Sequence, residues 1–140
     1  MERLNIYVIH STKFDYKNLL YKKLLSSSYC LSNNLILPMT KEYQEKYTKD
    51  LMNKADGIIV ELSHPSFGLW IELEYLKKIN KPKLFLSLDN KIPNNYKKLV
   101  NEFTKTTTED YLSTIEEFIK KVGEERQMSN PNQTYTLGEL

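Results

Sequence analysis

The stretch DGIIVELSHPSFGLWIELEY, residues 56–75, passes from a strand-like segment through a turn into a helix-like segment. Its first part is a β-branched apolar run, which is typical of a strand buried in a parallel sheet. A Pro-Ser-Phe-Gly turn follows, and Ser66 is a residue type that caps helices at their start. We therefore predict a strand over 56–62 and a helix over 67–80, with the carboxylate of Glu72 set among apolar neighbours.

The rest of the chain repeats this alternation of strand-like and helix-like segments. Apolar runs predict further strands over 4–9, 34–39 and 83–88, and a weak fifth strand over 103–106. Helical spacing predicts helices that begin near Asp15 and Tyr43, a short helix over 96–103 and an amphipathic helix over 109–122. Such alternation predicts an α/β fold, namely a flavodoxin-like (Rossmann-like) three-layer sandwich with a parallel sheet of about five strands in the order 2-1-3-4-5.

Composition is that of an ordinary folded domain. The chain has 140 residues, of which 40% are apolar and 27% charged, so we expect one domain over residues 1–123 and a polar C-terminal tail over 124–140. The net charge of +2 gives no reason to expect a nucleic-acid or membrane partner. Cys30 is the single cysteine, which excludes an internal disulfide and a multi-cysteine metal site. With no signal-peptide pattern and no membrane-length apolar run, we predict a cytoplasmic protein.

A ligand site is expected at one edge of this sheet. Ligands of such sheets bind at the carboxyl ends of the strands where the winding direction changes, here between strands one and three. The segments IHSTKFD and SHPSFGLWIE follow these two strands. In the first, His10 and Ser11 could face a substrate hydroxyl or phosphate, or their polar groups could make all of their hydrogen bonds within the fold. In the second, Ser66 could cap a helix and Gly68 could let the backbone approach a ligand closely.

Two interpretations of Glu72 follow from its position alone. It could be a catalytic carboxylate whose pKa is shifted by its apolar surroundings and by the positive end of the helix. It could also lie on a solvated helix face and pair with a lysine. Glu61, near the end of the same strand, could supply a second carboxylate or could bond to loop amides. The sequence has no GxxxxGK[ST], GxGxxG, HExxH or GxSxG motif, which excludes several familiar sites.

Three segments carry a resemblance to a known family. IYVIHSTKFDY, KDLMNKADGIIVELSHPSFGLWIELEY and NKPKLFL together resemble the nucleoside 2-deoxyribosyltransferase family, which includes the 2'-deoxynucleoside 5'-monophosphate N-hydrolases. The resemblance spans about 6–88. Its most specific part is an acid-led strand, a Pro-Ser-x-Gly turn and a glutamate four residues after the glycine.

The resemblance implies an activity and a set of site residues. It implies that a glutamate attacks C1' of a deoxyribosyl group, expels the base and forms a covalent intermediate that a second base or water resolves. The matching positions are Glu72 as nucleophile, Tyr7 as the tyrosine that orients it, Asp50 as the acid that assists the leaving base, Ser66 as a sugar or phosphate contact, and Asn95 as a polar residue given to the site of a neighbouring subunit. It also implies a homodimer or larger homo-oligomer, a nucleoside or nucleotide substrate, and neither a metal nor an organic cofactor.

This chain also departs from the family pattern. Trp70 stands where the family usually has a glycine, and could narrow the sugar pocket or turn away from it. Two alternatives therefore stay open: a nucleotide-binding module that has lost turnover, and a TIR-like enzyme that cleaves NAD. Base preference, phosphate requirement and the choice between transfer and hydrolysis are not fixed by the sequence.

Overall fold

The computed structural model describes residues 3–43, 47–98 and 111–128. The elements, in chain order, are β1 (Asn5–Ile9), the π-helical turn η1 (Lys17–Tyr21), α1 (Lys22–Leu25), α2 (Ser28–Leu31), β2 (Asn34–Ile36), α3 (Thr48–Lys54), β3 (Gly57–Glu61), α4 (Phe67–Leu76), β4 (Lys83–Leu86), α5 (Asn94–Lys97) and α6 (Tyr111–Met128). No helix among these is long and apolar enough to cross a membrane.

The described strands form one parallel sheet in the order β2-β1-β3-β4. β1 lies in the centre, where Ile6 pairs with Gly57 and Ile9 with Val60. The sheet therefore agrees with the first four strands of the predicted order. It has four strands where five were expected, and the fifth predicted strand, over 103–106, lies outside the described residues.

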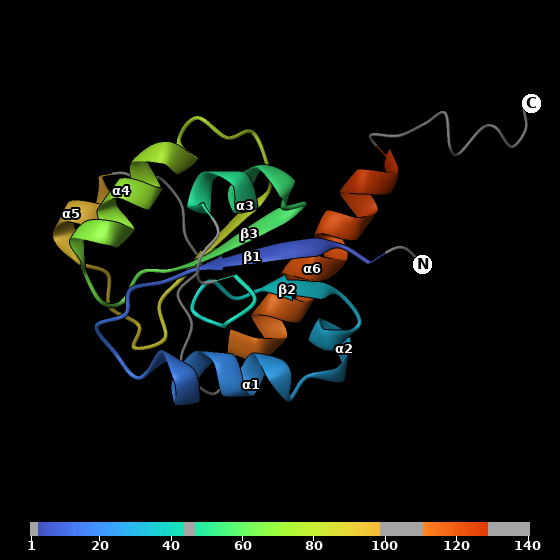
Figure 1. Ribbon diagram of the computed structural model, residues 1–140, viewed down its shortest axis with the longest axis horizontal. Coiled ribbons are helices and arrows are strands. Elements are labelled where there is room, and N and C mark those ends of the chain that lie inside the picture. The colour runs from blue at the N-terminus through green and yellow to red at the C-terminus, as the bar shows by residue number, and fades with distance from the viewer. Residues whose placement is uncertain (1–2, 44–46, 99–110, 129–140) are drawn as a thin grey trace, which may run out of the picture.

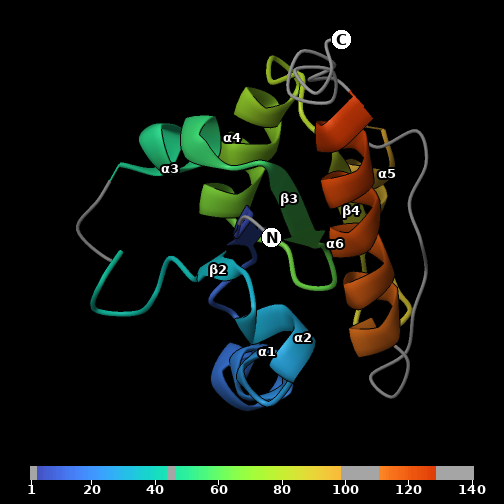
Figure 2. The same cartoon turned by 90° about the vertical axis from the view of Figure 1, so that its right-hand side faces the viewer.

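Helices cover both faces of the sheet, which makes a three-layer α/β sandwich. Because side chains alternate along a strand, Tyr7 and Ile9 pack with α3, α4 and the Tyr96 ring of α5, while Ile6 and Val8 pack with η1, α1 and α6. Figure 1 shows α3 and α4 on one side of the sheet and α1 and α2 on the other. In Figure 2, β3 stands between α4 and α6. The two apolar clusters bury most of the strand side chains, which is why the strands appear in the sequence as apolar runs.

Several boundaries differ from those predicted. The helix expected from Tyr43 begins at Thr48, because Tyr47 before it still has an extended backbone with ψ of 130°. The short helix α2 was not predicted; the Ser27 hydroxyl caps it by accepting a hydrogen bond from the Cys30 N–H.

The predicted domain boundary at 123 does not coincide with the end of a helix. α6 was expected to end at Val122 but continues to Met128. Its last turns are held against the sheet, since Arg126 pairs with Asp56 at 3.1 Å and the Asp56 carboxylate accepts the Asn5 N–H at 2.7 Å. The rest of the predicted tail, 129–140, lies outside the described residues.

Candidate active site

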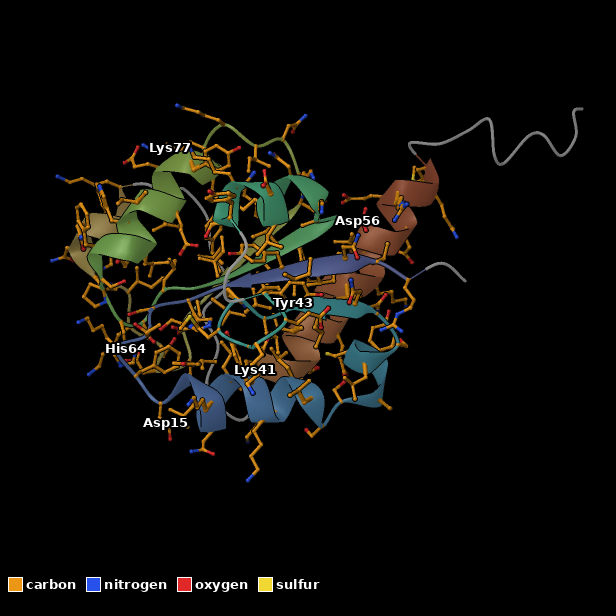
Figure 3. All side chains as sticks on the ribbon, in the orientation of Figure 1. Asp15, Lys41, Tyr43, Asp56, His64 and Lys77 are labelled. Atoms are coloured by element: carbon orange, nitrogen blue, oxygen red, sulfur yellow. The ribbon has the colours of Figure 1, made fainter. Side chains whose placement is uncertain are left out.

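A pocket of about 440 Å³ opens at the carboxyl ends of the strands. It is lined by residues that follow β1, by residues that follow β2 and by the first turns of α4: His10, Thr12, Lys13, Pro38, Met39, Tyr43, Thr48, Ser66, Phe67, Gly68, Leu69 and Glu72. Figure 3 shows Asp56 and His64 at opposite ends of β3, and the pocket lies toward the His64 end. The location is the one that the winding of the sheet predicts.

Glu72 lies in the second turn of α4 and lines this pocket. Burial raises the pKa of its carboxyl to about 7, and the hydroxyl of Tyr7 opposes the rise in part. The alternative in which Glu72 pairs with a lysine on a solvated face is not seen among the described residues: Glu72 lines the pocket, and on the same helix it is Glu74 that pairs with Lys77, at 3.1 Å. The site therefore contains a carboxyl group that exchanges its proton near neutral pH.

Tyr7 lies behind Glu72 on β1 and is fully buried. Burial, together with the charge of Glu72, raises the pKa of the Tyr7 phenol, while the Thr48 hydroxyl acts in the opposite direction. The Tyr7 hydroxyl is within electrostatic reach of both groups, yet it makes no hydrogen bond of full geometry to any described residue. A buried hydroxyl without a hydrogen-bond partner costs free energy. The Tyr7 hydroxyl would therefore gain stability by donating a hydrogen bond to the Glu72 carboxylate or to a ligand.

Ser66 and Gly68 form the start of α4 at the pocket wall. The Ser66 hydroxyl caps the helix by accepting the Leu69 N–H at 3.1 Å, and the Ser66 N–H donates to the Tyr96 hydroxyl at 2.9 Å. A Cβ atom added at Gly68 would meet no heavy atom within 4 Å. Packing therefore does not require a glycine here, and the open space beside it belongs to the pocket.

His10 and Ser11 directly follow β1, and both are buried. His10 lines the pocket, whereas Ser11 does not; the Ser11 hydroxyl accepts the Lys13 N–H at 3.0 Å and so shapes the loop. Burial lowers the pKa of His10, which keeps its imidazole neutral at pH 7.

The structure does not bring Asp50 or Asn95 to the pocket. Asp50 is exposed on α3, and Asn95 is exposed on α5; neither lines the pocket of its own chain. The predicted roles of both residues stay predictions, and Asn95 was in any case expected to serve a neighbouring subunit.

Trp70 turns away from the pocket. Its ring stacks on Tyr96 of α5 with a centroid distance of 6.1 Å and an interplanar angle of 22°, and Trp70 is absent from the pocket wall. Of the two possibilities raised by the sequence, the ring therefore turns away from the pocket, toward α5 and the apolar cluster around Tyr96, and does not narrow the pocket.

Glu61, the second carboxylate near this edge, has a structural role. It is fully buried and accepts hydrogen bonds from the Ser63 N–H, the Ser63 hydroxyl and, at 2.8 Å, the Leu88 N–H. These bonds join the end of β3 to the segment that follows β4. Glu61 is thus the loop-amide acceptor that one of its two interpretations predicted.

Sequence reasoning missed several pocket residues. Met39 and Tyr43 lie between β2 and α3, and Thr48 is the first residue of α3; nothing in their local pattern indicates a site. Lys13 was within the quoted loop after β1, and its cationic type at the end of a strand was the available signal. Among the described residues, no group of three His, Cys, Asp or Glu side chains could hold a metal ion.

A scan against protein-family models and a search of curated proteins both give no match for this chain.

Proposed function

We propose that this pocket is the active site of an enzyme that cleaves or exchanges the N-glycosidic bond of 2'-deoxynucleosides or their 5'-monophosphates. The observation that carries the proposal is Glu72: a carboxyl group with a pKa of about 7, lining a pocket at the carboxyl ends of the strands, with the buried Tyr7 hydroxyl beside it. Perturbed carboxyl groups in clefts of this kind are typical of catalytic sites. The resemblance of the surrounding sequence to nucleoside 2-deoxyribosyltransferases supports the choice of substrate.

The proposed reaction has two steps. The ionised Glu72 carboxylate attacks C1' of the sugar, the C1'–N bond breaks, and the base leaves with the bonding electrons and takes up a proton. Water, or a nitrogen of a second base, then attacks C1' and releases Glu72. The apolar surroundings withhold solvent from the carboxylate, and its negative charge stabilises the oxocarbenium character that develops on the sugar. This chemistry needs neither a metal nor an organic cofactor.

A chromatographic assay for released base tests the proposal. The protein is incubated with each 2'-deoxynucleoside, each 5'-monophosphate, ribose analogues and NAD, with and without a second free base. We expect release or exchange from a deoxyribosyl substrate, and we expect Glu72→Gln to lose it by at least about a thousandfold. Glu74→Gln is the matched control, since Glu74 lies on the same helix outside the pocket wall.

Other outcomes assign the site differently. Release of nicotinamide from NAD alone would favour the TIR-like alternative. Saturable binding of a nucleotide without release of base would favour a binding module, and full turnover by Glu72→Gln would exclude Glu72 as the nucleophile.

We further propose that the working form is a homodimer or larger homo-oligomer. α4 carries apolar residues on every side of its axis, and a helix of that kind is normally covered all round. In the single chain its Phe67 and Ile71 side chains are exposed, and Phe67 also lines the pocket. A second copy that covers this face would close the pocket to solvent.

A further inference from the structure

The two ring nitrogens of His10 are both occupied by groups of the protein. Nδ1 lies 2.9 Å from the carbonyl oxygen of Ser11, and Nε2 lies 2.6 Å from the hydroxyl oxygen of Tyr21. A carbonyl oxygen can only accept, so Nδ1 carries the proton and donates it. In the neutral ring Nε2 must then accept, and the Tyr21 hydroxyl is its donor.

The same Tyr21 hydroxyl also holds the segment after β2. It accepts the Met39 N–H at 3.2 Å, so one oxygen joins the last turn of η1, the end of β1 and the Pro38–Met39 wall of the pocket. Tyr21 is buried, and its hydroxyl donates one hydrogen bond and accepts another. The π-helical turn positions this residue: the Lys22 N–H bonds five residues back, to Lys17, and Tyr21 is the last residue of the turn.

Aromatic rings around His10 prevent it from changing its orientation easily. The Tyr16 ring lies against it at 4.8 Å with a tilt of 32°, and the Phe14 and Tyr21 rings meet it edge-on at 6.2 and 5.1 Å. Since interiors are packed closely, a flip of the imidazole would have to displace these rings.

We propose that Tyr21 is a positioning residue: its hydroxyl holds the His10 imidazole, whose Nδ1–H tautomer the Ser11 carbonyl sets, and it holds the Met39 segment beside that ring, so that the pocket has a rigid wall next to the end of β1. The inference rests on the proposed function for its effect on turnover, but its structural part concerns the free protein. It changes the expected role of His10: with both nitrogens occupied, His10 shapes the pocket and offers no ring nitrogen to a substrate.

Nitrogen-15 NMR of the imidazole rings in the free protein at pH 7.5 tests the structural part. The chain has 2 histidines, so a His64→Gln sample assigns the His10 signals. We expect a neutral His10 with its proton on Nδ1 and a hydrogen-bonded Nε2. In Tyr21→Phe, which removes only the hydroxyl, we expect the Nε2 signal to shift as it loses its hydrogen bond, while the proton stays on Nδ1, which still faces the Ser11 carbonyl. A proton on Nε2 in the unmutated protein overturns the proposal, whether or not any variant folds.

Kinetics test the functional part. We expect Tyr21→Phe to raise KM about tenfold and to leave kcat within about twofold, because the lost hydroxyl loosens a wall and removes no reacting group. Tyr16→Phe is the matched control, since Tyr16 meets His10 with its ring face, and it should change neither KM nor the His10 spectrum. An unchanged KM in Tyr21→Phe would overturn the positioning role. If no substrate is turned over, the proposed function fails, and the NMR result still decides how Tyr21 and His10 are bonded.

Discussion

At the scale of single residues, Glu61 and Glu72 show that one type of side chain takes different roles in different surroundings: Glu61 is fully buried, and Glu72 is partly buried at the pocket wall. Glu61 is held by three donor groups that belong to its own loop and to the segment after β4. Glu72 faces a pocket, and among the described residues it is the Tyr7 hydroxyl that opposes the effect of desolvation on its pKa. The first arrangement stabilises the fold, and the second maintains a carboxylate at a cost in stability, which is typical of functional sites.

The pKa of Glu72 predicts how activity depends on pH. The proposed nucleophile must be ionised, and its pKa in the free protein is about 7. We therefore expect kcat/KM to rise tenfold per pH unit below that value and to level off above it. A pH profile from 5 to 9 with the best substrate of the base-release assay measures this. A profile that falls as the pH rises through 7 would instead make Glu72 a proton donor.

Substitution of the two glutamates should change stability in opposite directions: burial raises the pKa of both carboxyl groups, but only Glu61 is bonded by several donors that a substitution would leave without an acceptor. The pKa of Glu72 is raised from 4.5 to about 7 on folding, so the folded state holds its proton more tightly and stability falls as pH rises through this window. The free energy of unfolding of Glu72→Gln should thus be higher than that of the unmutated protein at pH 8, by on the order of 2–3 kcal/mol, and equal to it at pH 4. Glu61→Gln should cost about 1–3 kcal/mol at pH 7, because one oxygen cannot serve three donors.

Urea unfolding at pH 4, 7 and 8 measures these differences. Equal stability of Glu72→Gln and the unmutated protein at pH 8 would contradict the buried, high-pKa state of Glu72. A Glu61→Gln protein as stable as the unmutated one would mean that its hydrogen bonds contribute little.

At the scale of elements, the sequence predicts strands better than helices. β1, β3 and β4 were placed within about two residues, because strands buried on both faces leave long apolar runs in the sequence. The start of α4 was also predicted, since Ser66 is a strong cap. The predicted start of the helix at Tyr43 was wrong. The spacing of the tyrosines fits a helix, but the backbone at Tyr47 is extended and α3 begins at Thr48. α6 continues through Gly123, although a glycine there predicts the end of a helix. Long-range packing and the Arg126–Asp56 ion pair outweigh this local preference.

Gly57, the first residue of β3, and Gly68, in the first turn of α4, should respond differently to an added methyl group. At Gly57 a Cβ would lie 2.9 Å from Val122 Cγ2, so Gly57→Ala should push α6 away from β3 and cost about 1–3 kcal/mol. Gly68 is helical and beside open space, so Gly68→Ala should stabilise the fold by about 0.5–1 kcal/mol. Its methyl group would stand at the pocket wall and raise KM. Thermal unfolding and kinetics of both variants check this, and a loss of stability in Gly68→Ala would contradict the open geometry.

At the scale of the whole molecule, the pocket is a product of tertiary structure. Glu72, Ser66 and the end of β1 were predicted because the winding of the sheet fixes where its strand ends meet. The bonds from Tyr21 to His10 and Met39 were not, since they join residues 11 and 18 positions apart that no local period connects. Likewise, Asp50 is exposed because of where α3 begins, and the sequence around α3 did not predict that start correctly.

The exposed face of α4 predicts how copies of the chain associate. Phe67 is 79% exposed and Ile71 is 51% exposed, and residues four apart lie on one face of a helix. A two-fold interface uses the same patch on both copies, so α4 would meet α4 and bring α5, which packs on it through Trp70 and Tyr96, to the same boundary. Asn95 would then approach the pocket of the other copy, as the sequence resemblance implies.

Ile71→Glu tests this association, because a carboxylate at the centre of an apolar interface would be desolvated without a partner. We expect light scattering after gel filtration to give a dimer or larger species for the unmutated chain and the monomer mass of 16.6 kDa for Ile71→Glu. Leu25→Glu is the matched control, since Leu25 is 49% exposed on α1 in the opposite layer, and it should remain associated. If closure of the pocket depends on the second copy, Ile71→Glu should also lose turnover although Ile71 does not line the pocket. A fully active monomer would show that each chain excludes water from Glu72 by itself.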